Sequence, residues 1–493
     1  MAADDTKKTP VMEAPPEAKV SCEIVRLEDN LSPEEDRRLL RIADKWIMPL
    51  LFVTYMFQYL DKSTLANTAI LGLRSDLHLQ GQDYSWASSI FNFGYLAASA
   101  PIAFMIVRLP MAKFMAVSVS IWGGVLMSMA ATHNAGGLIT TRFFLGFVEA
   151  AVAPGFSIIV SMWYKRSEQP LRNGVWFLGN VVSGFFAGPL TYAFGHVTTF
   201  SSWKLVFLVF GGLTVLWGII MFFLLPESPA KAWFMTKEDR TKSVVRVKED
   251  AVGVKHNEWR SEQMFEALRD PKAWFTVIIM LVTNIPNGGI SNFAPIVING
   301  FGFSVNETFL VNMIVTGFQA FFVLAATIGS TYLPNTRTVF MVLASTIGLV
   351  GAVVIRQLDN SNIWARYSGY CLLSAYTVNF PMVLIMNTAN SAGITKKTTV
   401  NAMSFVSYCV GNIIGPQLFF AHEAPSYPAG FASMLVCFVV AIFATIGLRF
   451  YLIWENRKKE RIHGSVTEDN IEAAAELSGD KTDRELPCFR YVY

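Results

Sequence analysis

The sequence has little charge and few cysteines. Only 16% of its 493 residues are Asp, Glu, Lys or Arg, against roughly 25% in an average soluble domain. The sequence contains no phosphate-binding glycine loop, metal-ligand cluster or nucleophile triad. The cysteines have neither disulfide nor metal spacing and are Cys22, Cys371, Cys409, Cys437 and Cys488. These absences argue against an enzyme or an ATP-driven pump, and we expect no cofactor and no nucleic-acid partner.

Long uncharged apolar runs are abundant instead, and 53% of the residues are hydrophobic. Runs of about 20 apolar residues are typical of helices that cross a bilayer. The sequence therefore predicts an all-α membrane protein with twelve transmembrane helices in two six-helix bundles. The predicted spans are 45–73, 84–106, 111–131, 137–159, 173–194 and 203–225, then 273–298, 306–328, 336–356, 366–387, 398–420 and 429–453.

Polar segments divide the chain. We predict a disordered cytosolic tail (1–42), an N-terminal bundle (43–225), a charged cytosolic connector (226–272), a C-terminal bundle (273–453) and a cytosolic tail (454–493) whose acidic end is disordered. The first forty residues lack the apolar core of a secretory signal. Lys and Arg are concentrated in loops on the connector's side, which places both termini in the cytosol.

Asp61 and Lys62 interrupt the first apolar run. The stretch 46–60 would rise only on the order of 20 Å as a helix, too little for roughly 30 Å of hydrocarbon. A spanning helix must therefore contain Asp61 and Lys62. Since each would cost roughly 2.5–3.5 kcal/mol at the bilayer centre, both are expected to face a protein-lined, watered interior.

Arg142 and Glu149 are the other deep charges, and their spacing of two turns places them on one face of a helix. With Asp61 and Lys62 they sum to zero charge. One interpretation is static ion pairs that hold the two helices together. The other is a relay in which an entering anion faces Lys62 or Arg142 while Glu149 or Asp61 takes up a proton.

The span 273–298 contains Pro286, Gly288 and Gly289, which predict a kinked or broken helix. Its amides could form a substrate wall, although buried polar residues are often only structural. The polar candidates for substrate binding are Asn180, Asn284, Asn287, Gln319, Tyr408 and Asn412.

At these residues the chain resembles the fungal allantoate permease branch of the anion:cation symporter family, within the major facilitator superfamily. The motifs that carry the resemblance are Leu60-Asp61-Lys62, Arg142-Phe-Phe-Leu-Gly146-Phe-Val-Glu149, Asn284-Ile-Pro-Asn-Gly-Gly-Ile290, Gly302-Phe-Ser304, Gly393-Ile-Thr395-Lys396-Lys397, Gly411-Asn412-Ile-Ile-Gly415-Pro416-Gln417 and Phe489-Arg490-Tyr491.

The resemblance implies proton-coupled import of a small organic anion. It implies that Glu149 takes part in proton coupling, that Lys62 faces the substrate carboxylate, and that Arg142 belongs to the same network. Many relatives have Arg where this chain has Lys62, which offers a point charge in place of a planar fork.

We therefore expect a multi-pass plasma-membrane symporter, monomeric in the bilayer, that imports allantoate or a related ureido or carboxylic acid by alternating access. Protons are the expected coupling ion. Three alternatives stay open: an importer of a vitamin or sulfur-containing carboxylate such as pantothenate or nicotinate, a proton-coupled exporter of anionic metabolites, and a nutrient sensor that no longer transports.

Overall fold

The computed structural model describes residues 32–165, 168–195, 197, 200–251, 259–333, 335–359, 361–464 and 480–493. Every regular element in these ranges is helical, which confirms the all-α prediction. Most of the predicted amino-terminal tail, part of the connector and residues 465–479 lie outside the described residues.

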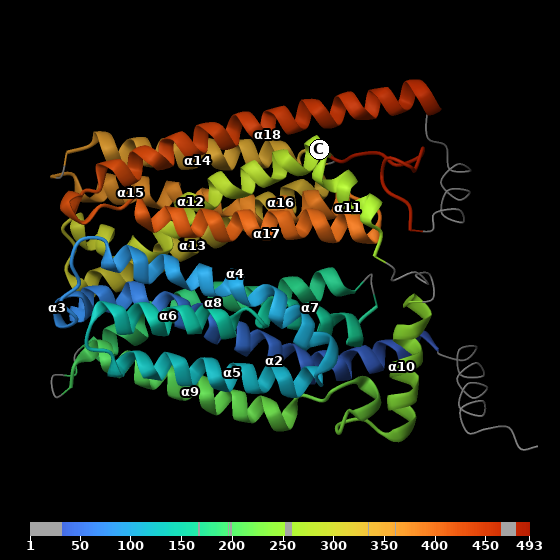
Figure 1. Ribbon diagram of the computed structural model, residues 1–493, viewed down its shortest axis with the longest axis horizontal. Coiled ribbons are helices and arrows are strands. Elements are labelled where there is room, and N and C mark those ends of the chain that lie inside the picture. Colours follow the sequence, from blue (N-terminus) through green and yellow to red (C-terminus); the bar gives the residue numbers. More distant parts are fainter. Residues whose placement is uncertain are drawn as a thin grey trace, which may run out of the picture.

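The amino-terminal helices form one bundle and the carboxyl-terminal helices form another beside it (Figure 1). The first bundle comprises α2 (Pro33–Thr68) with η1 (Ala69–Leu73) and α3 (Arg74–Asp76), α4 (Asp83–Arg108), α5 (Met111–Ser128) with η2 (Met129–Ala131), α6 (Ala135–Glu149), α7 (Val152–Trp163), α8 (Gln169–Gly195) and α9 (Ser202–Leu224). The predicted span 137–159 is thus two helices, α6 and α7, which meet at residues 150–151.

The connector contains η3 (Pro229–Lys231), α10 (Lys237–Ala251) and α11 (Ser261–Leu268). The second bundle comprises α12 (Pro271–Gly300), α13 (Val305–Tyr332), α14 (Arg337–Gln357), α15 (Ile363–Leu373) with η4 (Ser374–Val378) and α16 (Asn379–Asn390), α17 (Ile394–Gln417), η5 (Ala421–Glu423) and α18 (Pro428–His463).

Ten segments of the described chain are long and apolar enough to cross a membrane. Helices α2 and α17 occupy two further predicted spans but are not among the ten. Both helices carry polar residues along their length, including Asp61 and Lys62 in α2. The count of twelve spans therefore stays a prediction.

Residues 33–42, which fall within the predicted tail 1–42, are the first turns of α2. Ser32 and Glu35 form a capping box, in which the Glu35 backbone N–H donates to Ser32 Oγ over 3.2 Å. Asp36 then pairs with Lys165 and Arg246 at 2.8 Å each. The cap and these ion pairs explain why the helix begins before the membrane.

Helix α12 runs without a break from Pro271 to Gly300, so the broken form of the predicted helix is wrong, and the kinked form stays a prediction. Its glycines serve close packing against α17 instead. A Cβ at Gly288 would lie 2.7 Å from the Asn412 Cα, and one at Gly415 only 2.2 Å from the Ile285 carbonyl oxygen. This tight contact supports α12 where Pro286 removes a backbone donor.

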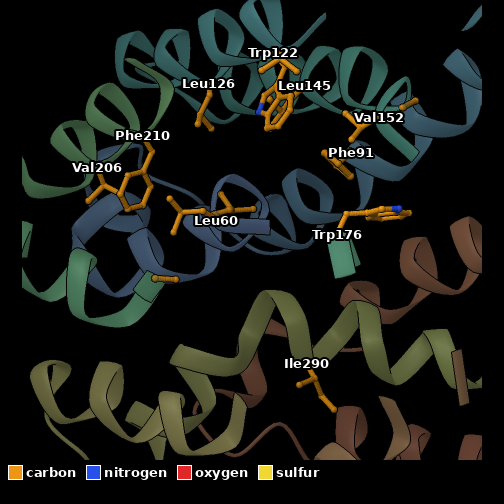
Figure 2. Packing of buried hydrophobic residues seen from close by; sticks show 14 of the residues in the cluster. Leu60, Phe91, Trp122, Leu126, Leu145, Val152, Trp176, Val206, Phe210 and Ile290 are labelled. Atoms are coloured by element: carbon orange, nitrogen blue, oxygen red, sulfur yellow. The ribbon is translucent and has the colours of Figure 1, made fainter. Parts of the chain in front are cut away.

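The apolar core occupies both bundles. Figure 2 shows Leu60, Trp122 and Phe210 gathered within the amino-terminal bundle, with Ile290 in the carboxyl-terminal bundle. The bundles are joined at the end opposite the connector, where Tyr84 Oη donates to the Asn292 carbonyl over 2.7 Å and Ser89 Oγ donates to the Ile413 carbonyl over 2.7 Å. No salt bridge between described residues joins the bundles at the connector end.

The end of the carboxyl-terminal tail also differs from our expectation of disorder. Residues 480–493 lie against the connector end of the carboxyl-terminal bundle, with Asp483 and Tyr491 buried. Their contacts with the bundle are long-range ion pairs and hydrogen bonds, which composition does not reveal.

Candidate functional site

A cavity of about 520 Å³ lies between the two bundles, a volume within the range of small-molecule sites. Among the described residues that line it, only Lys62 and Glu149 belong to the ionisable types Asp, Glu, Lys and Arg. Seven of the predicted site residues line this cavity, namely Lys62, Glu149, Asn180, Asn284, Asn287, Gln319 and Tyr408. Their roles in transport stay predictions.

Lys62 on α2 reaches across the cavity to the other bundle. Its Nζ donates to Tyr408 Oη of α17 over 3.2 Å. The ammonium also lies 6.0 Å from the centre of the Phe91 ring and 5.9 Å from that of Tyr408. An ammonium has three donors, so Lys62 can hold Tyr408 and still donate to an anion.

Glu149 is the last residue of α6, and its side chain is 1% exposed. Gln58 Nε2 donates to Glu149 Oε1 over 3.0 Å. The second oxygen, Oε2, is buried without a hydrogen-bond partner among the described residues. Glu149 therefore has one oxygen held by a neutral amide and one at which a proton can be gained or lost.

Arg142 does not line the cavity, and its predicted role in substrate binding stays a prediction. It is 1% exposed, and its Nε donates to the Ala87 carbonyl of α4 over 3.4 Å. Its guanidinium lies 5.4 Å from the centre of the Phe91 ring, and Phe91 does line the cavity. The aromatic ring thus forms the wall where Arg142 was expected.

Asp61 also lies outside the cavity, contrary to the expectation that it and Lys62 both face the watered interior. Its Oδ2 accepts hydrogen bonds from Trp122 Nε1 of α5 over 2.8 Å and from Thr214 Oγ1 of α9 over 3.0 Å. Consecutive residues on a helix point about 100° apart, so Asp61 anchors α2 within its own bundle while Lys62 points across.

Static ion pairing of the four deep charges is not found. No salt bridge between described residues involves Asp61, Lys62, Arg142 or Glu149. Each has neutral hydrogen-bond partners instead. This arrangement leaves the cation and the carboxylate of the cavity without a direct ion pair between them.

A chain of amides connects α12 to α17. Asn287 Nδ2 donates to Asn412 Oδ1 over 2.9 Å, and Asn412 Nδ2 donates to Asn284 Oδ1 over 3.3 Å. Tyr376 Oη donates to Asn287 Oδ1 over 3.1 Å. Asn412 itself does not line the cavity, so it orients the amides that do.

Several lining residues were missed in the sequence. The most informative is Gln58, which contacts Glu149. It lies four residues before Lys62, on the same helical face, and this spacing could have identified it. Tyr376 and Phe380 lie in η4 and α16, and no local pattern distinguishes them from the many aromatic residues that contact lipid.

Comparisons with known proteins concern the chain as a whole. The family model described as Major Facilitator Superfamily matches residues 51–416. An uncharacterized transporter of Schizosaccharomyces pombe is 33% identical over 93% of this chain and 86% of its own length. The allantoate permease of Saccharomyces cerevisiae is 33% identical over 94% of this chain and 88% of its own length.

Among solved structures, a bacterial homolog of the human lysosomal transporter Spinster, inward-facing and occupied, superposes with a TM-score of 0.62. The alignment covers 83% of this chain and 96% of that chain at 15% identity. At this identity the likeness concerns the fold alone.

Proposed function

Because the chain belongs to the major facilitator superfamily of transporters, we propose that it imports a small organic anion together with protons. The observation that carries the proposal is the pair Lys62 and Glu149, the charged residues of the described cavity wall, which form no salt bridge with each other. An ammonium without a paired carboxylate is a site for a substrate carboxylate.

Charge balance gives the coupling mechanism. Lys62 and Glu149 sum to zero when both are ionised, so an entering monoanion makes the cavity negative. Protonation of Glu149 restores neutrality, and proton binding and anion binding therefore favour each other. An inside-negative potential opposes a monoanion by roughly 2.3 kcal/mol per 100 mV, a penalty that one co-transported proton cancels.

The proposed substrate is allantoate or a related ureido acid. The similarity to an allantoate permease supports this choice. So does the chemistry of the wall opposite Lys62, because Asn284 and Asn287 offer amide donors and acceptors suited to a ureido group. In this proposal the carboxylate binds Lys62 and the ureido end faces the amides of α12.

The proposed location is the plasma membrane, with both termini in the cytosol and the chain acting as a monomer. The excess of Lys and Arg in the loops on the connector's side supports the cytosolic termini.

The test is uptake of labelled allantoate by permease-deficient fungal cells that express this chain. We expect uptake well above that of cells with an empty vector, and competition by unlabelled ureido acids. Stronger competition by pantothenate or nicotinate would replace the ureido acid with a vitamin carboxylate. Efflux of preloaded label without uptake would refute import.

A further inference from the structure

The last fourteen residues form an ordered segment that the transport mechanism does not use. We name residues 480–493 the carboxyl-terminal clasp. Asn390 at the end of α16 exchanges two hydrogen bonds with the Val492 backbone, at 2.9 and 2.8 Å. Asn456 of α18 exchanges two with the Tyr491 backbone, both at 2.8 Å. The clasp is thus held to two helices by paired bonds.

Asp483 lies at the centre of the clasp and is fully buried. Its carboxylate pairs with Lys272 at the start of α12 and, over 2.7 Å, with Lys396 at the start of α17. Tyr491 Oη donates a third bond over 2.7 Å. Asp483 therefore joins the first turns of two helices that are distant in sequence.

The two lysines need this carboxylate. Lys272 is 6% exposed and Lys396 is fully buried, and a buried ammonium without a paired anion is strongly unfavourable. Asp270 also contacts both lysines, at 3.4 and 2.9 Å. Two buried cations thus face two buried acids at this point, and Asp483 is the acid supplied by the clasp.

The clasp also holds the connector. The Asp480 carbonyl accepts a bond from Gln263 Nε2 of α11 over 2.8 Å, and Glu266 of α11 pairs with Lys396 over 2.8 Å. At the other bundle, Arg246 of α10 pairs with Asp36 over 2.8 Å. The two connector helices are therefore attached to different bundles.

Helices α12 and α17 carry the cavity residues Asn284, Asn287 and Tyr408. We propose that Asp483 is a positioning residue for transport, through which the carboxyl-terminal clasp fixes the connector ends of α12, α17 and α11 as one unit. Alternating access needs each bundle to move as a rigid body. The clasp holds the helices of the carboxyl-terminal bundle together at its connector end, where no salt bridge between described residues joins it to the other bundle.

The inference concerns helix geometry and does not depend on which anion is carried. Its test compares Asp483→Asn with Glu485→Gln. The control removes a charge from the same segment, because Glu485 is exposed and, among the described residues, its carboxylate accepts from the nearby Thr482 backbone alone. Asp483→Glu, which keeps the charge, serves as the conservative rescue.

Spin labels on the exposed positions Trp274 of α12 and Thr398 of α17, in a background with the native cysteines replaced, report the distance between the helix ends without any substrate. We expect the distance distribution to broaden in D483N, to stay as in the parent in E485Q, and to narrow again in D483E.

Uptake per molecule of surface protein is the second measurement. We expect D483N to lower it roughly tenfold, because a misplacement of about 1 Å at a working site can cost up to roughly a hundredfold. Should D483N not reach the membrane, Tyr491→Phe removes one bond to Asp483 and is measured in the same way. An unchanged distance distribution, or unchanged uptake per molecule with only less protein, would overturn the positioning role.

Discussion

Replacement of Lys62 by methionine is the sharpest perturbation of the proposed anion site. Methionine keeps much of the length of the side chain but removes the one positive charge among the described residues that line the cavity. A hydrogen bond to a charged group contributes about 1.5–3 kcal/mol. At about 1.4 kcal/mol per factor of ten, this predicts a 10- to 150-fold weaker affinity for a carboxylate substrate.

Coulomb's law gives an upper bound for the same change. Two unit charges about 4 Å apart interact by about 4 kcal/mol at an effective dielectric constant near 20, so losses much beyond a thousandfold would point to misfolding. Lys62→Arg keeps the charge, and we expect a smaller loss because the guanidinium must fit a cavity that holds Tyr408 at 3.2 Å from the ammonium.

The assay is the concentration dependence of labelled-anion uptake, normalised to surface protein. Ser63→Ala is the matched control, since Ser63 also lines the cavity but its hydroxyl donates to the Leu60 carbonyl of its own helix. An apparent affinity within twofold of the parent in Lys62→Met would refute the assignment of Lys62 to the substrate carboxylate.

Three further results are expected. Glu149→Gln should abolish accumulation against a gradient but retain exchange of labelled for unlabelled anion; full accumulation would remove Glu149 from proton coupling. Tyr408→Phe should weaken anion affinity a few-fold, because it removes the hydroxyl that holds the Lys62 ammonium in place, whereas Tyr95→Phe should not; unchanged affinity in Tyr408→Phe would contradict this role of the phenol. The third concerns pH: burial raises the pKa of Asp483, but Lys272 and Lys396 hold it well below its ordinary value. The stabilisation that ionised Asp483 contributes is thus complete above about pH 4, and it is lost only as the pH falls through the lower pKa of the folded state. The difference in thermal unfolding midpoint between the parent and D483N should therefore be constant from pH 5 to 8. A difference that is already smaller at pH 5 would contradict this.

The helical spacing of residues around Lys62 predicts more of the residues that line the cavity than the positions of the charges do. Lys62 lies in the cavity together with Tyr55, Gln58 and Tyr59, which precede it by seven, four and three residues on one helical face. Asp61 belongs to the face of Thr54, which contacts Met221 of α9. Helical periodicity therefore predicts that Asp61 and Lys62 lie on different faces of α2. We had expected both to face the interior because each charge is costly to bury in the bilayer.

Other features depend on contacts between distant segments and are not encoded locally. Arg142 and Glu149 do share the face of α6 as predicted, but Phe91 of another helix determines that only Glu149 lines the cavity. Likewise, the polar composition near Asp483 predicted disorder, because its two lysine partners precede it by 211 and 87 residues.

Proton-driven accumulation by the purified protein in liposomes tests the central claim most directly. Labelled allantoate is added outside vesicles with an inward proton gradient, with and without a protonophore, and Glu149→Gln vesicles serve as the uncoupled control. Without the protonophore, we expect the internal concentration of allantoate to rise above the external one. With the protonophore, we expect the two concentrations to become equal. Accumulation that is the same with and without the protonophore, or simple equilibration in both cases, would contradict proton-coupled import.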